Sequence, residues 1–171
     1  GRCMLLGAVL VMAGLLTGCI SGNVANPRMG LSAHFAGVMG GIMMLALGAG
    51  WRHVQLGATA ERWALGLLAF GNIANWATVL LAAIWGAGRT TMPLAAGEHA
   101  ATAWQENLVG ILLVALSLAM VAGIAIMAGW LVPRQFPGYY NVIFGAVIFL
   151  YGAYRFAIVF MQMQGENRGG L

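Results

Sequence analysis

Long apolar segments alternate with short polar connections along the whole chain. The apolar segments cover residues 3–20, 31–50, 63–85, 102–131 and 139–163, and each has about 18 residues or more, enough to cross a bilayer core. The connections hold an Asn-Pro pair at 26–27, charged residues at 52–62, a glycine-rich loop at 86–101 and prolines at 133 and 137. Ser32 is placed to cap the second segment. The pattern predicts an all-α, polytopic membrane helix bundle.

The composition makes the lipid bilayer the main partner of the chain. Hydrophobic residues make up 61% and charged residues 7% of 171 residues, and the mean hydropathy is +0.87. A soluble core of this length would carry many more charges. The basic residues are all arginines, scattered over connections and helix ends rather than gathered among aromatic residues. The positive charge is therefore poor evidence for nucleic-acid binding, and we expect no nucleic-acid partner.

The composition changes after about residue 135. All six tryptophans come before this point, and all four tyrosines come after it. We therefore expect residues 1–135 to form a four-helix membrane domain, and residues 136–171 to add a fifth transmembrane helix and a polar tail. Chance variation of interfacial aromatic residues is the alternative. A separate helix at residues 139–163 would also suit docking on a larger membrane assembly.

Small residues recur every four positions in the first two segments. The two sets are Gly14, Gly18, Gly22 and Ala33, Gly37, Gly41. Such spacing lets helices approach closely in lipid, so it predicts a tight bundle and a homo-oligomer, although glycine is common in membrane helices generally. Residues 16–19, Leu-Thr-Gly-Cys, also look like a lipoprotein cleavage site, but we expect this segment to be retained as a helix.

One histidine, His34, lies inside the second apolar segment. A polar ring there is costly unless it is paired, ligated or facing a cavity. Neutral imidazole is a common axial ligand of haem iron, and Gly37 and Gly41, one and two turns later, would leave room for a flat macrocycle. We therefore predict metal ligation by His34 with both glycines beside the cofactor. A hydrogen-bonded structural histidine is the alternative, and His53 and His99 fit solvated or interfacial positions.

Two further groups could carry chemistry. Asn72, Asn75 and Thr78 share roughly one helical face beside Trp76, so they could orient a substrate in an apolar pocket or hold helices together. Glu106 opens the fourth segment, where it could face the bundle or simply favour the positive end of the helix dipole.

Several stretches of the first 132 or so residues resemble hydroxylaminobenzene mutases, a family of small bacterial membrane enzymes. In order, the stretches are Asn26-Pro27-Arg28-Met29-Gly30-Leu31-Ser32-Ala33-His34, Ala74-Asn75-Trp76, LLAAIWGAG at 80–88, MPLAAG at 92–97 and LSLAM at 116–120. The family moves oxygen from nitrogen to the ring and so converts hydroxylaminobenzene to 2-aminophenol. More distantly, the layout looks like styrene oxide isomerase.

The second resemblance implies four membrane helices, a homotrimer and haem b held between subunits, with the iron acting as a Lewis acid. The Ala33-His34 pair matches the Ala-His pair that carries the iron ligand in that family. The chain departs from the pattern at Ala36, where the mutases carry an acid, and at Gly40, where both families carry an asparagine. Thr78 stands near the position of the isomerase tyrosine.

The sequence leaves three functions open. The first is a haem-b-dependent isomerase of the bacterial inner membrane that rearranges a small aromatic N-hydroxyl compound, with Asn75, Asn72 and Thr78 orienting the substrate. The second is an epoxide isomerase. The third is a non-catalytic haem-binding or structural subunit of a larger complex, which the losses at Ala36 and Gly40 would suit. A transporter is disfavoured because no inverted repeat or buried charge pathway is present.

Overall fold

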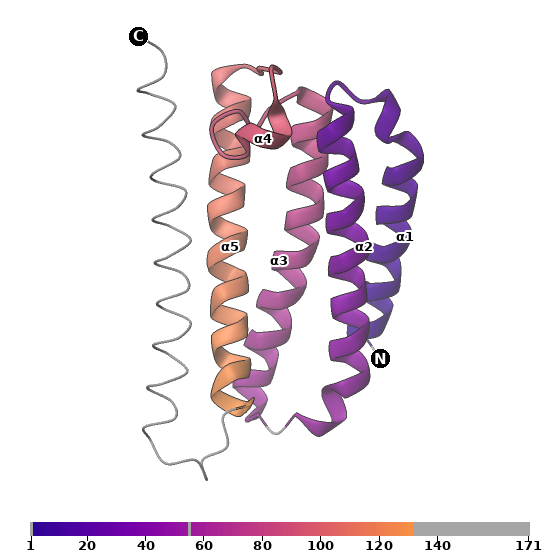
Figure 1. Cartoon of the computed structure of the whole chain (residues 1–171). Helices are drawn as coiled ribbons and strands as arrows, with labels where there is room; N and C mark the ends of the chain where they lie inside the picture. The colour runs from indigo at the N-terminus through magenta and orange to yellow at the C-terminus, as the bar shows by residue number, and fades with distance from the viewer. Residues whose placement is uncertain (1, 55, 132–171) are drawn as a thin grey trace. The chain divides into compact units, whose positions relative to one another are not determined.

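The chain is a multi-pass helical membrane protein, as the sequence predicts. The computed structural model describes residues 2–54 and 56–131, with side chains described up to residue 127. Its elements are α1 (Arg2–Ile20), α2 (Pro27–Gly50), α3 (Ala58–Trp85), α4 (Pro93–Ala96) and α5 (Ala103–Leu131), with 3-10 turns at Ser21–Asn23 and Trp51–His53 (Figure 1). The four longer helices are each long and apolar enough to cross a membrane. The predicted helix at 139–163 and the boundary at 135/136 lie outside the described residues.

The long helices pack side by side in chain order (Figure 1). Between α1 and α2 the backbones almost touch, since a Cβ on Gly7 would lie 2.8 Å from the carbonyl oxygen of Gly41. Between α3 and α5, a Cβ on Gly71 would collide with Cγ of Met120. Glycine therefore sets the helix spacing at both contacts, as the small-residue pattern predicts for a tight bundle.

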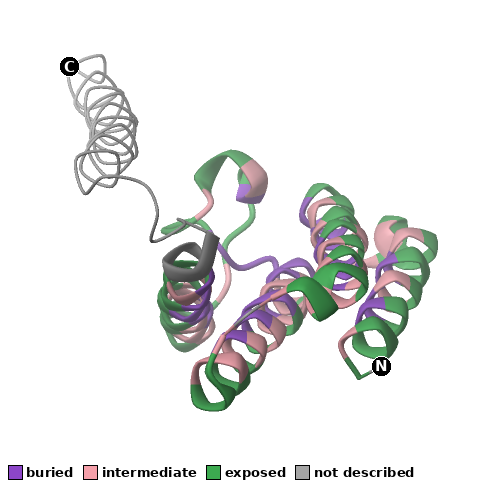
Figure 2. Ribbon diagram, turned by 90° about the horizontal axis from the view of Figure 1, so that it is seen from below, coloured by how far each residue is buried: buried purple, intermediate pink, exposed green. Residues whose placement is uncertain are grey.

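Two apolar clusters occupy the two ends of the bundle. The cluster next to α4 draws on α2, α3, α4 and α5, and its members include Met29, Ala33, Val79, Ala82, Ala96 and Val109. The cluster at the other end draws on α3 and α5, and its buried members are Ala64, Leu68 and Met127. Buried residues lie along the sides of the helices that face one another (Figure 2). Many large apolar side chains are exposed on the other sides. Outward apolar side chains are what a lipid environment requires.

The structure corrects two predicted helix starts. Ser32 does not cap α2. The N-cap of α2 is Asn26, whose side chain accepts a hydrogen bond from the backbone N–H of Met29. Pro27 is the first residue of the helix. Proline suits that position because its missing N–H would be unpaired there anyway. Likewise α3 begins at Ala58 rather than Trp63, which places the charged residues Glu61 and Arg62 inside its first turns.

Candidate active site

The His34 ring is held by a backbone group of α1. Its Nδ1 lies 2.8 Å from the carbonyl oxygen of Gly14. A carbonyl can only accept, so Nδ1 donates and carries a proton. In a neutral imidazole the lone pair is then on Nε2, which is the arrangement that metal-ligating histidines adopt. The ring is partly buried and lies 5.2 Å from the ring of Phe35, centroid to centroid.

Gly37 and Gly41 lie in the helix contacts beside the histidine. A Cβ on Gly37 would lie 2.7 Å from both the Cα of Gly14 and Cδ1 of Trp76. A Cβ on Gly41 would lie 2.6 Å from the backbone nitrogen of Val11. In this structure α1 and Trp76 fill the space that the sequence assigned to a flat macrocycle, so both glycines serve close helix packing.

Trp76 joins three helices near the histidine. Its Nε1 donates to Oγ1 of Thr17 on α1 at 3.0 Å, and the Thr17 hydroxyl donates to the carbonyl of Ala13 at 2.8 Å. The indole also packs against Gly37, which is one turn along α2 from His34. Thus Trp76 lies in the same helix junction as the histidine.

The structure separates Asn72 from His34 along the α2–α3 contact. Asn72 is 4% exposed, its Nδ2 donates to the carbonyl of Leu68 at 2.7 Å, and its Oδ1 lies next to Gly40. Since Gly40 and His34 are six residues apart on α2, the Asn72 amide lies about 9 Å along the helix from the histidine. The Asn72 amide therefore serves the α2–α3 contact at Gly40.

Asn75 and Thr78 lie on the same helix as Asn72. Asn75 is half-buried, whereas Thr78 is 1% exposed. Gly37 lies opposite Trp76, so the antiparallel register brings Thr78 nearer to the level of His34 than Asn72 is. Of these three polar side chains, Asn75 is therefore the one that stays partly accessible.

Sequence reasoning missed the contribution of α1. Gly14 provides the hydrogen-bond acceptor for the histidine, and Thr17 provides the acceptor for the tryptophan. Gly18 lies against the imidazole ring, because a Cβ there would be 2.7 Å from Nδ1. The signal was the four-residue spacing of Gly14 and Gly18, which predicted close packing but not its partner.

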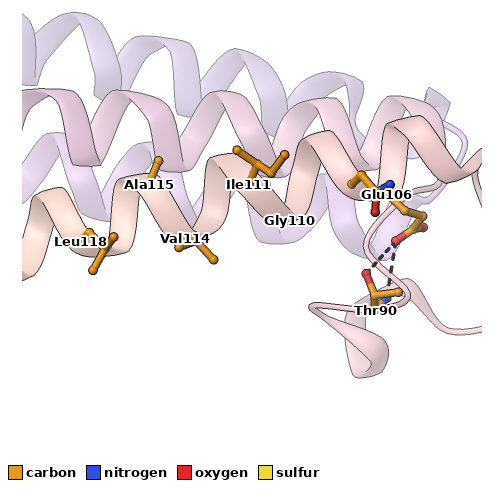
Figure 3. Close-up of a pocket in the computed structure, with 8 residues that line it drawn as sticks. Thr90, Glu106, Gly110, Ile111, Val114, Ala115 and Leu118 are labelled. Carbon is orange, nitrogen blue, oxygen red and sulfur yellow. Dashed lines mark hydrogen bonds between the residues drawn. The ribbon is translucent and has the colours of Figure 1, made fainter.

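Glu106 binds the connection before α4. It lies in the first turn of α5, and its carboxylate accepts hydrogen bonds from the backbone N–H groups of Gly88 and Arg89 at 3.0 and 3.3 Å. It also accepts from the backbone N–H and the hydroxyl of Thr90 at 3.4 and 3.2 Å (Figure 3). Both carboxylate oxygens are therefore engaged. The acid lines a groove of about 630 Å³ whose other walls include Ile111, Val114 and Leu118 of α5.

Residues 2–54 and 56–131 contain no group of three or more His, Cys, Asp or Glu side chains placed to hold a metal ion. His34 is thus a single imidazole rather than part of a multidentate protein site.

The sequence matches one protein-family model and two characterised bacterial proteins. A sequence model of the styrene oxide isomerase family matches residues 1–132. Hydroxylaminobenzene mutase HabB of Ectopseudomonas oleovorans is 46% identical over 129 residues, covering 75% of this chain and 78% of that protein. Hydroxylaminobenzene mutase HabA of the same organism is 40% identical over 116 residues, covering 68% of this chain and 86% of that protein. No solved structure matches the chain.

The fold and these matches define the class as a multi-pass membrane isomerase. The chain belongs to the styrene oxide isomerase family, and the two relatives are named hydroxylaminobenzene mutases.

Proposed function

We propose that this protein rearranges an aromatic N-hydroxyl compound, converting hydroxylaminobenzene to 2-aminophenol or carrying out the same reaction on a close analogue. The names and coverage of the two mutase relatives support this substrate class. In such a rearrangement an N–O bond breaks and a ring C–O bond forms within one molecule. Atoms and electrons balance without a co-reactant, so the protein needs to supply only binding, orientation and polarisation.

The Nε2 atom of His34 suits haem b, which would bind away from Gly37 and Gly41 because α1 and Trp76 fill the space there. The observation that carries the proposal is the 2.8 Å hydrogen bond from Nδ1 to the Gly14 carbonyl, because it leaves Nε2 free to bind a metal. His34 is the residue that would hold the haem. When bound, ferric haem would supply a Lewis acid that polarises the oxygen of the substrate without net redox change.

The remaining side chains would bind and shield the substrate. The Trp76 indole presents an apolar surface in the same helix junction as His34, which suits an aromatic ring. Asn75 is the polar residue of its helix face that keeps accessible surface, so it is our first choice for a hydrogen bond to substrate, ahead of Thr78 and Asn72. The surrounding apolar helices would exclude water from a cation-like intermediate.

An epoxide is the second candidate substrate, because the matching family is described as styrene oxide isomerase. In that rearrangement a C–O bond of the epoxide breaks, a hydrogen moves to the carbon that loses the oxygen, and a carbonyl forms, so atoms and electrons balance within one molecule. We further propose that the enzyme works as a homotrimer in a bacterial inner membrane. The exposed large apolar side chains would serve contacts between subunits as well as with lipid, and the bacterial source of the relatives supports the choice of membrane.

The test compares histidine variants of the detergent-purified protein. We expect the wild type to show a haem Soret band and to convert hydroxylaminobenzene, and H34A to lose both together. H53A is the matched control, because His53 is exposed beyond the end of α2, and it should keep both properties. An active, haem-replete H34A protein would contradict the proposal. A folded wild type with neither haem nor turnover of either substrate would favour a non-catalytic subunit.

A further inference from the structure

We infer that α1 is a functional part of the histidine site. Gly14 would fix the protonation pattern of the His34 ring, and Gly18 would set its position. This inference rests on the proposed function, in which Nε2 of His34 binds a cofactor metal. It assigns positioning roles to two α1 residues that lie 16 and 20 positions before the histidine in the sequence.

The ring of His34 lies directly on Gly18. A Cβ on Gly18 would lie 2.7 Å from Nδ1, 3.1 Å from Cε1 and 3.2 Å from Cγ. One turn earlier, the Gly14 carbonyl accepts the Nδ1 proton at 2.8 Å. Residues four apart lie on the same side of a helix, so the Gly14 carbonyl and Gly18 form one continuous surface against the His34 ring. In an α-helix this carbonyl also receives the N–H of residue 18, and its two lone pairs accommodate both donors.

The two glycines differ in what a side chain would disturb. A Cβ on Gly14 would lie 2.6 Å from the backbone nitrogen of Val38 and 2.8 Å from the carbonyl carbon of Gly37, so it would push the helices apart. The three contacts closest to a Cβ on Gly18 are all atoms of the His34 ring. G18A should therefore displace the ring while leaving the α1–α2 packing in place.

A backbone carbonyl suits this role because it cannot become a donor. Donation from Nδ1–H to a carbonyl fixes the tautomer and orientation of a ligating histidine and raises the basicity of the other nitrogen. With the ring displaced from Gly14, both tautomers become available. The effect on metal binding then follows from ring geometry rather than from loss of the ligand itself.

The first experiment reads the tautomer without any cofactor. The full chain, labelled with nitrogen-15 histidine and prepared without haem, is studied by NMR in detergent at an alkaline pH that keeps imidazole neutral. H34Q identifies the His34 signals among the three histidines. We expect the wild type to carry its proton on Nδ1, and G18A to show a tautomer mixture or the Nε2–H form. G66A is the matched control, because a Cβ on Gly66 meets nothing within 4 Å, and it should match the wild type.

A haemin titration of the same variants gives the second readout. We expect about tenfold weaker binding by G18A than by G66A, the size typical for loss of an outer-shell partner. An Nε2–H tautomer in the wild type would overturn the inference. So would an unchanged tautomer in G18A. If the wild type shows the Nδ1–H form but binds no haemin, the positioning by α1 stands and the proposed haem function fails.

Discussion

One buried asparagine fixes the start of the helix that carries the histidine. Asn26 is 1% exposed, and its Nδ2 donates to the carbonyls of Ala95 and Ala96 at 3.0 and 3.1 Å. Its backbone N–H donates to the carbonyl of Ala83, and its Oδ1 caps α2. A single side chain therefore ties the α2 N-terminus to α4, about two turns before His34.

Replacing this asparagine should weaken the whole bundle. N26A removes the cap and the side-chain donor to the carbonyls of Ala95 and Ala96, of which the Ala96 carbonyl keeps the N–H of His99. We therefore expect a loss of about 2–3 kcal/mol in unfolding free energy. N26D keeps the capping oxygen but turns the paired donor into a carboxylate facing those carbonyls. It should destabilise at least as much as N26A. Equilibrium unfolding in mixed micelles measures both, and wild-type stability of N26D would show that capping alone matters.

Glu106 should hold the α3–α4 connection without supporting the helices themselves. E106Q keeps one acceptor oxygen but turns an amide group toward N–H donors, so the bonds to residues 88–90 weaken. Because the site is largely accessible, we expect several-fold faster hydrogen exchange at residues 88–90 and little change in the long helices. E98Q, at an exposed position between α4 and α5, is the control. Uniform destabilisation of all helices would contradict a local role.

At the scale of helices, the contact between α1 and α2 depends on the absence of side chains. A Cβ on Gly41 would lie 2.6 Å from the Val11 nitrogen and 2.7 Å from the Gly7 carbonyl oxygen, and backbone atoms cannot rotate away. We expect G41A to lose about 1–2 kcal/mol, because overpacking outweighs the gain in helix propensity. G66A, which meets open space, should be neutral or slightly stabilising. Thermal unfolding of the two variants checks the difference.

The positions of the four long helices could be predicted from the sequence because only continuous helices satisfy the backbone inside lipid. Their starts could not, since the start of α2 depends on Asn26 meeting carbonyls about 70 positions later. The four-residue helix α4 is too short to leave a periodic signal. His34 was identifiable as a polar ring in an apolar segment. Its partner Gly14 was not, because lipid-facing and buried faces are both apolar here, so the sequence pattern carries little information about helix rotation.

At the scale of the molecule, all the residues of the described core lie in the part of the chain that matches the family. Both apolar clusters are built from residues between Met29 and Met127, and the family match covers residues 1–132. By its internal contacts the chain divides near the same point, into 1–130 and 131–171. The isomerase function and the four-helix core therefore belong to the same stretch of sequence.

A chain shortened to residues 1–132 should accordingly fold and keep the activity of the full chain. We expect a monodisperse detergent particle, cooperative thermal unfolding within a few degrees of the full chain, and similar turnover of hydroxylaminobenzene. A chain ending at residue 102 is the control and should fail to fold, because it removes Val109 from one cluster and Met127 from the other. Folding with lost turnover would instead make residues 133–171 part of the catalytic assembly. Loss of folding by the 1–132 chain would show that the four helices need those residues for stability, and would contradict a self-sufficient core.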